Sequence, residues 1–242
     1  MKHETIEILN IPFANITQEQ ALDILEGFLN EQKNHIIVTP NPEGVMQSSR
    51  NLAFAEALIN ADLSLADGIG ILLASILLGK RLPERVRGVD TAFALFKRLA
   101  EKNRPTTVYF LGGKDGIAQQ AAQNMQAKYP NLKIIGYHHG FAPPEDEPRI
   151  VAEINELAPE ILFVCTGMPR AELWATRNKN INTRLTLCLG GTIDIMAGNV
   201  KLAPAPLRRI GMEWLYRLIT QPSRALRMLD IPRFMLTVLF KG

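Results

Sequence analysis

The sequence of 242 residues has little of what marks a secreted or membrane-spanning protein. It has two cysteines, Cys165 and Cys188, each inside an apolar run, which argues against a disulfide framework and indicates buried thiols in a reducing compartment. Its first ten residues contain no basic stretch followed by an apolar one, so no signal peptide is predicted. The longest strongly apolar run, 69–78, is too short to cross a bilayer. We therefore expect a cytoplasmic protein that is soluble or lies on the inner face of the plasma membrane.

Metal-ligand patterns are missing as well. The four histidines, His3, His35, His138 and His139, have no partner at the spacing of a metal site. No Asp-x-Asp pair follows an apolar run, and the acidic stretch 145–147 lies beside prolines, as in a solvated loop. No Ser-His-Asp or Cys-His arrangement points to nucleophilic catalysis. The sequence therefore predicts neither a bound metal nor another cofactor.

Negative charge is scarce near the C-terminus. Segment 201–242 has eight Lys or Arg residues against Glu213 and Asp230, a net charge of +6, whereas the whole chain carries +3. Its interleaved Leu, Met and Phe residues suit a lipid surface better than a phosphate backbone. The apolar run 234–240 is suited to lying in the membrane interface. We therefore predict an anionic membrane surface, and no nucleic acid, as a partner of this segment.

What the sequence does contain is a regular alternation of apolar strands and helical stretches. The predicted strands are continuous apolar runs at 5–9, 35–38, 63–66, 107–111, 132–135, 161–165 and 185–189. A capping box at Thr17–Gln20 opens a helix that extends to about residue 32. Further helices are predicted near residue 44 and at 69–78, 90–102, 115–128, 148–157 and 169–180. The 69–78 helix is apolar on all sides and is predicted to be buried.

This pattern is typical of an α/β fold, a mainly parallel sheet with helices on both faces. No strand is predicted after Gly191, and the rest of the chain is helical and basic with several prolines. The sequence therefore predicts two parts, an α/β domain at 1–200 and a C-terminal appendage at 201–242.

Ligands bind such sheets beyond the carboxyl ends of the strands. Asp67 is the first polar residue after one strand, and Gly68 follows it. Its carboxylate fits a general base or the N-cap of the next helix, and the two roles are compatible. The glycines of segment 112–116 fit either a tight turn or a phosphate contact made by backbone N–H groups. They lack the spacing of a dinucleotide site or of a P-loop.

Six strings stand in order along nearly the whole chain. They are TPNPE (39–43), ADGIG (66–70), ERVRGVD (84–90), GMPRAELW (167–174), GGTIDIMAG (190–198) and GMEWLYRL (211–218). Together they closely resemble the WecG/TagA/CpsF family, glycosyltransferase family 26. The resemblance implies a Rossmann-like domain with a C-terminal appendage that helps to close the site at the membrane.

The resemblance also implies an inverting, metal-independent transferase. Family members commonly move N-acetylmannosamine from its UDP-sugar to a polyprenyl-diphosphate-linked N-acetylglucosamine, the polyprenyl being undecaprenyl, in the synthesis of teichoic acid or other surface polysaccharides. By match to the six strings, Asp67 is the expected base, with Thr39 and Asn41 beside it and Arg85 in the donor or acceptor pocket. The other residues expected to bind substrate are Gly68, Gly112, Gly113, Gly167, Pro169, Arg170, Glu172, Gly191 and Asp194.

Departure of a nucleotide diphosphate builds up negative charge, which fixed positive groups must offset when no metal is bound. The candidates in the appendage are Arg217, Arg224 and Arg227. The chain has Arg170 and Ala171 where the family usually has Lys and Gln, and loss of the Gln amide bears on substrate preference.

Several alternatives stay open. One is a transferase of the same family with a different UDP-sugar, and another is a non-catalytic nucleotide- or lipid-binding subunit. An oxidoreductase would need GxGxxG and an acidic residue about 20 positions later, and neither is clearly present. A homo-oligomer is also possible.

Overall fold

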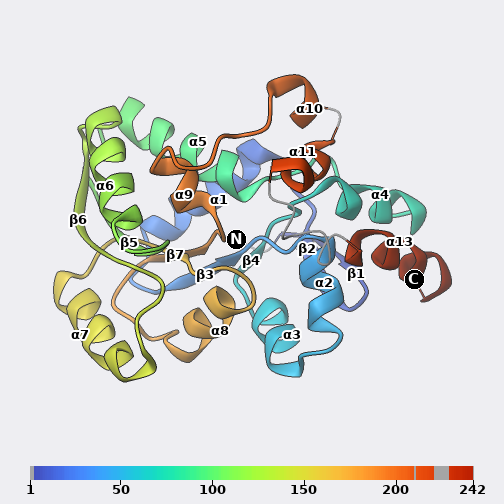
Figure 1. The fold of residues 1–242 in the computed structure, drawn as a ribbon, viewed down its shortest axis with the longest axis horizontal. Helices are drawn as coiled ribbons and strands as arrows, with labels where there is room; N and C mark the ends of the chain where they lie inside the picture. The colour runs from blue at the N-terminus through green and yellow to red at the C-terminus, as the bar shows by residue number, and fades with distance from the viewer. Residues whose placement is uncertain (1–2, 210, 221–228, 242) are drawn as a thin grey trace.

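The computed structural model describes residues 3–209, 211–220 and 229–241. At its centre is a six-stranded sheet in the order β4-β3-β8-β7-β5-β6, with every neighbouring pair parallel (Figure 1). Its strands are β3 (His35–Val38), β4 (Leu63–Ser64), β5 (Thr106–Gly112), β6 (Leu132–His138), β7 (Ile161–Cys165) and β8 (Leu185–Cys188). The predicted α/β fold is confirmed, and all six carboxyl ends lie at one edge of the sheet.

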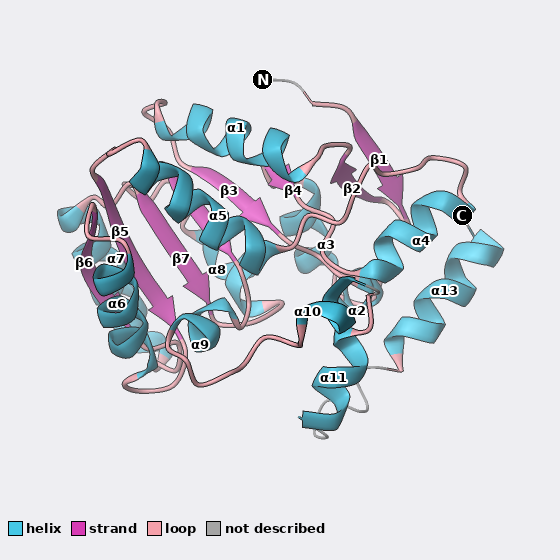
Figure 2. Ribbon diagram, turned by 90° about the horizontal axis from the view of Figure 1, so that it is seen from above, coloured by secondary structure: helices cyan, strands magenta, loops and turns pink. Residues whose placement is uncertain are grey.

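Helices cover both faces of this sheet, as Figure 2 shows from above. One layer consists of α1 (Gln18–Leu29), α5 (Gly88–Glu101), α6 (Ile117–Lys128) and α9 (Thr192–Met196). The other contains α2 (Pro42–Ser48), α3 (Leu52–Ile59), α7 (Glu147–Leu157) and α8 (Arg170–Arg177), with a short 3-10 turn (Pro144–Asp146) before α7. Phe110 and Phe163 pack into the first layer, whereas Tyr109 and Leu162 pack into the second. Burial on both faces is why the strands are continuous apolar runs.

An antiparallel hairpin, β1 (Thr5–Ile8) and β2 (Ile11–Ala14), lies outside the main sheet. Its first strand was predicted, but its second strand was missed. The turn between them consists of Leu9 and Asn10, whose φ angles are +50° and +65°. Two-residue hairpin turns need positive φ and usually contain glycine, which makes them recognisable in a sequence. Leu-Asn carries no such signal, and α3 was also not predicted.

The start of α1 is set by the predicted capping box. The Thr17 hydroxyl accepts from the Gln20 N–H at 3.3 Å, and Gln20 Oε1 accepts from the Thr17 N–H at 2.8 Å. Both bonds satisfy donors that the first helical turn leaves unpaired. The helix ends at Leu29, about one turn earlier than predicted.

The helix α4 (Ile69–Leu77) was predicted to be buried on all sides, and this is wrong. Ile71 and Ala74 are fully buried, whereas Leu73, Ile76 and Leu77 are 45%, 50% and 49% exposed. The reason is that β1 and α13 cover only part of the helix. The three exposed residues follow the i, i+3, i+4 spacing, so they form one apolar stripe.

The described part of the chain after residue 200 is helical, with α10 (Ala205–Arg209), α11 (Glu213–Thr220) and α13 (Asp230–Lys241). Helix α13 packs against α2 and α4 and buries Phe234 and Val238 in the core. Its other face exposes Leu236, Leu239 and Phe240. The apolar run 234–240 therefore divides between packing on the body and an open surface. Within the described residues, no helix combines the length and apolar character needed to cross a bilayer.

Candidate active site

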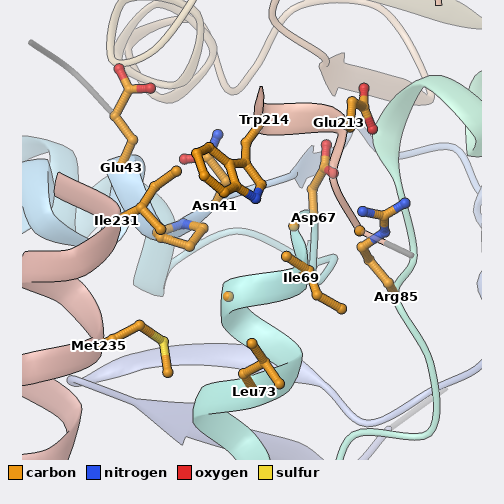
Figure 3. Close-up of a pocket in the computed structure, with 14 residues that line it drawn as sticks. Asn41, Glu43, Asp67, Ile69, Leu73, Arg85, Glu213, Trp214, Ile231 and Met235 are labelled. Carbon is orange, nitrogen blue, oxygen red and sulfur yellow. The ribbon is translucent and has the colours of Figure 1, made fainter. Parts of the chain in front are cut away.

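A cavity of about 240 Å³ lies beyond the carboxyl ends of β3 and β4, where the body meets α11 and α13 (Figure 3). Its polar lining side chains are Asn41, Glu43, Asp67, Arg85 and Glu213. Its apolar lining side chains include Ile69, Leu73, Trp214, Ile231 and Met235. In this view Asp67, Arg85 and Glu213 lie at the upper right, and Asn41 and Glu43 lie at the upper left beside Ile231. Leu73 and Met235 lie below them. The cavity is therefore polar at one end and apolar at the other.

Asp67 reaches this cavity directly from the sheet. The Asp67 N–H donates to the Leu65 carbonyl at 3.0 Å, a tight turn just after β4. Gly68 is the N-cap of α4, with φ of +115° and no side-chain cap, so the capping role falls to Gly68 and not to Asp67. A Cβ on residue 68 would lie 3.2 Å from Pro42 Cδ, and the positive φ would strain it further. This turn leaves the Asp67 carboxylate facing the cavity.

Asn41 and Thr39 follow β3 and take different places. Asn41 Oδ1 accepts from the Gly44 N–H at 2.9 Å and caps α2, which holds the side chain at the cavity wall. The Thr39 hydroxyl donates to the Cys188 carbonyl at 3.3 Å, and it does not line the cavity. The structure therefore brings Asn41, Asp67 and Arg85 together at one cavity, and the lining of that cavity does not include Thr39.

Arg85 links the cavity to the appendage. Its Nη2 donates to the Arg208 carbonyl at 3.1 Å. Partial burial, and after it the charge of Arg87, lower the pKa of Arg85 below its ordinary value, whereas the negative charge of Asp67 raises it. A guanidinium keeps its charge despite such a shift. The cavity therefore holds a fixed positive charge close to a carboxylate.

Arg87 holds the appendage to the body by charge. Its side chain is 5% exposed; Nη1 donates to Asp90 Oδ2 at 2.8 Å, and Nη2 lies 2.8 Å from Glu213 Oε2. The contact with Glu213 is an ion pair without the alignment of a good hydrogen bond. Arg208 adds a longer contact of 3.7 Å to Asp90. Farther along the appendage, Gly211 packs so closely against α4 that a Cβ on it would lie 2.7 Å from Ile69.

A second group of predicted residues lies farther along the same edge. Arg170 and Thr166 help line a separate cavity of about 380 Å³ near the ends of β5 and β7. Arg170 donates to the Thr166 carbonyl at 2.8 Å and lies over the Phe141 ring. Gly167 and Pro169 form the turn that leads into α8. These four residues do not line the Asp67 cavity.

The glycines at the end of β5, Gly112 and Gly113, have a packing explanation. A Cβ on Gly112 would lie 2.6 Å from the Cys165 carbonyl oxygen, and one on Gly113 would lie 2.6 Å from Ile117. Both residues have positive φ. The tight-turn interpretation therefore explains both residues, and a nucleotide contact at this turn stays a prediction.

Two more predicted positions follow β8. Gly191 is the N-cap of α9, and Asp194 lies in its first turn. Neither residue lines the Asp67 cavity or the Arg170 cavity.

Glu172 lies beneath this edge of the sheet and not on a pocket wall. It is 2% exposed, and its Oε2 has no hydrogen-bond partner. Burial raises the pKa of Glu172 to about 7. The adjacent Ala171 is fully buried. The family usually has Gln at this position, so this turn of α8 lacks the side-chain amide that the resemblance leads one to expect.

The lining residues that sequence reasoning missed come mostly from the appendage. Met235 was assigned to the run 234–240 that is suited to the membrane interface, and Ile231 was given no role. Trp214 and Glu213 stand in the GMEWLYRL string of the resemblance, which was the signal that could have found them. Arg224 and Arg227 lie outside the described residues, as does the side chain of Arg217. Among the residues that are described, no three His, Cys, Asp or Glu side chains are gathered as metal ligands would be.

This geometry suits the transfer of a group between two bound molecules. A carboxylate at the end of a strand can accept a proton from a hydroxyl, and the nearby guanidinium can hold an anionic group. The apolar end adds a surface that a polar or charged ligand would not need.

Comparison with known proteins gives this site a context. Residues 6–242 match the Glycosyl transferase WecG/TagA/CpsF family. A Bacillus subtilis (strain 168) protein named N-acetylglucosaminyldiphosphoundecaprenol N-acetyl-beta-D-mannosaminyltransferase is 33% identical over 99% of this chain and 92% of its own length. Proteins of the same name from Bacillus spizizenii and Staphylococcus aureus (strain MRSA252) are each 32% identical, over 88% and 95% of this chain and 81% and 90% of their own lengths. The chain is a glycosyltransferase and belongs to the WecG/TagA/CpsF family.

Proposed function

We propose that this chain transfers N-acetylmannosamine from UDP-N-acetylmannosamine to N-acetylglucosamine carried on undecaprenyl diphosphate. The names of the relatives supply the acceptor and the transferred sugar. The observation that carries the proposal is the Asp67 cavity, in which a carboxylate, a guanidinium and an apolar wall meet. A lipid-linked, anionic sugar acceptor needs all three.

In this proposal Asp67 is the general base of a single displacement. A hydroxyl of the acceptor sugar attacks the anomeric carbon and gives its proton to Asp67. The new C–O bond forms as the bond from that carbon to the UDP oxygen breaks, so the configuration inverts and UDP leaves with its electron pair. Arg85 pairs with the acceptor's diphosphate, and its positive charge also helps to offset the negative charge that builds up on the departing UDP. Arg217, Arg224 and Arg227 stay candidates for the same task.

The exposed stripes on α4 and α13 support a place at an anionic membrane surface. Leu73, Ile76 and Leu77 lie on one helix, and α13 beside it exposes a second apolar stripe. Lys80 and Arg81 follow α4 and are exposed. Apolar side chains next to basic ones suit the boundary between acyl chains and anionic headgroups.

A different donor sugar is the second candidate. Buried Ala171 stands where the family usually has Gln, and the Arg170 guanidinium is already engaged by the Thr166 carbonyl. A site that lacks a polar contact discriminates less strictly between sugars that differ in one hydroxyl or amide. The same assay with a panel of UDP-sugars separates the two candidates.

The test is transfer to a lipid-diphosphate N-acetylglucosamine analogue by wild type and by Asp67→Asn. Asn keeps the size of the side chain and cannot take the proton, so kcat should fall by about 10² or more, while the donor KM changes by less than about twofold. Glu156→Gln, which removes an exposed carboxylate on α7 away from the described cavities, is the matched control and should retain activity. Near-normal kcat in folded Asp67→Asn would remove Asp67 as the base.

A further inference from the structure

The apolar end of the active-site cavity is built by two helices from distant parts of the chain. Leu73 comes from α4, whereas Ile231 and Met235 come from α13. We call this the α4–α13 groove. The two helices lie side by side in both ribbon views, and they pack against each other. Figure 3 shows the Leu73 and Met235 side chains between the two helices.

The groove is held in shape by close contacts. A Cβ on Gly70 would lie 2.6 Å from Pro42 Cγ, so α4 sits against the start of α2 with no room to move inward. On the other side, Phe234 and Val238 are 0% and 2% exposed and anchor α13 in the core. The groove is therefore a feature of the packed fold.

The groove also opens toward an apolar surface. Leu73 lines the cavity and is 45% exposed, and it continues into Ile76 and Leu77 on the same stripe. Met235 lines the cavity, and the neighbouring Leu236 is 55% exposed. An apolar path thus runs from the cavity that holds Asp67 to the outside of the molecule.

We propose that the α4–α13 groove binds the first isoprene units of the acceptor lipid, next to its diphosphate. This inference rests on the proposed function and adds the place where the lipid lies. A branched hydrocarbon packs well against the side chains of Leu, Ile and Met, and each CH₂ buried there contributes about 0.8 kcal/mol to binding. A nucleotide base would leave its polar edges without partners against these side chains. The polar end, with Arg85 and Asp67, then receives the diphosphate and the sugar.

The experiment compares two acceptors that differ only in their lipid. Both carry N-acetylglucosamine on a diphosphate; one ester has a short water-soluble alkyl group and the other a farnesyl group, and both are assayed in the same detergent. Leu73→Gln and Met235→Gln put an amide into the groove. Ile59→Gln on α3 and Leu157→Gln on α7 are matched controls, because these apolar residues are 47% and 38% exposed and belong neither to the cavity lining nor to the apolar path.

Wild type should show a lower KM for the farnesyl acceptor than for the short one. Leu73→Gln and Met235→Gln should each raise the farnesyl KM about tenfold, equivalent to about 1.4 kcal/mol, and leave the short-acceptor KM within about twofold. The controls should leave both values within about twofold. All four changes are at half-buried or exposed positions, so they should fold.

Four results would overturn the inference. Equal KM values of wild type for the two acceptors would show that no lipid is bound near the site. An equal rise for both acceptors in Leu73→Gln would place the effect on the sugar or diphosphate. A matching rise of the farnesyl KM in Ile59→Gln would show that any exposed apolar-to-Gln change has this effect. Transfer to neither acceptor by wild type would overturn the proposed function itself, and the groove with it.

Discussion

Removing the charge of Glu213 is expected to loosen the appendage from the body. Arg87 is held by two carboxylates, Asp90 and Glu213, each at 2.8 Å, and its own side chain is 5% exposed. Loss of one partner from a buried ion pair typically costs about 3–5 kcal/mol. Because Asp90 remains and is 40% exposed, we expect Glu213→Gln to cost about 2 kcal/mol.

This cost falls on docking of the appendage more than on folding of the body. When α11 leaves, Arg87 becomes hydrated and keeps Asp90, so the body does not retain a bare buried charge. A change of about 2 kcal/mol shifts the ratio of docked to undocked appendage by about thirtyfold. Undocking also removes Trp214 from the cavity and the Arg208 carbonyl from Arg85.

Amide hydrogen exchange of α11, read by mass spectrometry, measures the docked fraction. Glu213→Gln should lower protection in residues 213–220 by about an order of magnitude or more, with protection in β5 and β7 unchanged. Glu101→Gln is the matched control, because Glu101 pairs with Lys97 at 3.7 Å while both are well exposed. Exposed pairs contribute little, so this control should behave as wild type. Equal protection of α11 in Glu213→Gln and wild type would refute the charge-based account of docking.

Two further predictions concern a buried acid and metal ions. The pKa of Glu172 is about 7 in the folded protein against 4.5 ordinarily, so the folded state holds the extra proton, and stability is lost as pH rises from about 4.5 through 7. The free energy of unfolding should fall by about 3 kcal/mol by pH 8. Denaturant titrations at pH 5 and pH 8 measure this loss, and Glu172→Gln should abolish it. An equal change of unfolding free energy with pH in both proteins would argue against a raised pKa. Transfer activity should persist in excess chelator, because Arg85 and the appendage arginines supply the positive charge; loss of activity restored by magnesium or manganese would show that a metal supplies it.

The fold was predictable because the strands are buried on both faces. Strands such as 161–165 are apolar at every position and lie between amphipathic helices, a pattern that only a covered parallel sheet explains. What escaped prediction depends on the neighbours of a segment. The hairpin turn at Leu9 and Asn10 has no glycine, and the exposure of α4 depends on where α13 packs against it.

The site was predictable in its polar half. Asp67, Asn41 and Arg85 follow strands or stand in strings that resemble a known family, and the structure brings them to one cavity. The apolar half was not predicted, because Leu73 was assigned to a buried helix and Met235 to a run suited to the membrane interface. An apolar pattern shows that such a residue avoids water, and it does not show whether protein, membrane or ligand fills the space in front of it.

The chain was divided on sequence at about residue 200, into a catalytic domain and a membrane-associating tail. As a folding boundary this division stays a prediction, but the cavity crosses it. Glu213 and Met235 come from one side of the boundary, and Asp67 and Leu73 come from the other. The docked appendage therefore completes the polar end through the Arg85 contact and the apolar end through α13. The helix that closes the cavity is also the one that exposes Leu236 and Leu239, so in the proposed function one element both completes the site and faces the lipid.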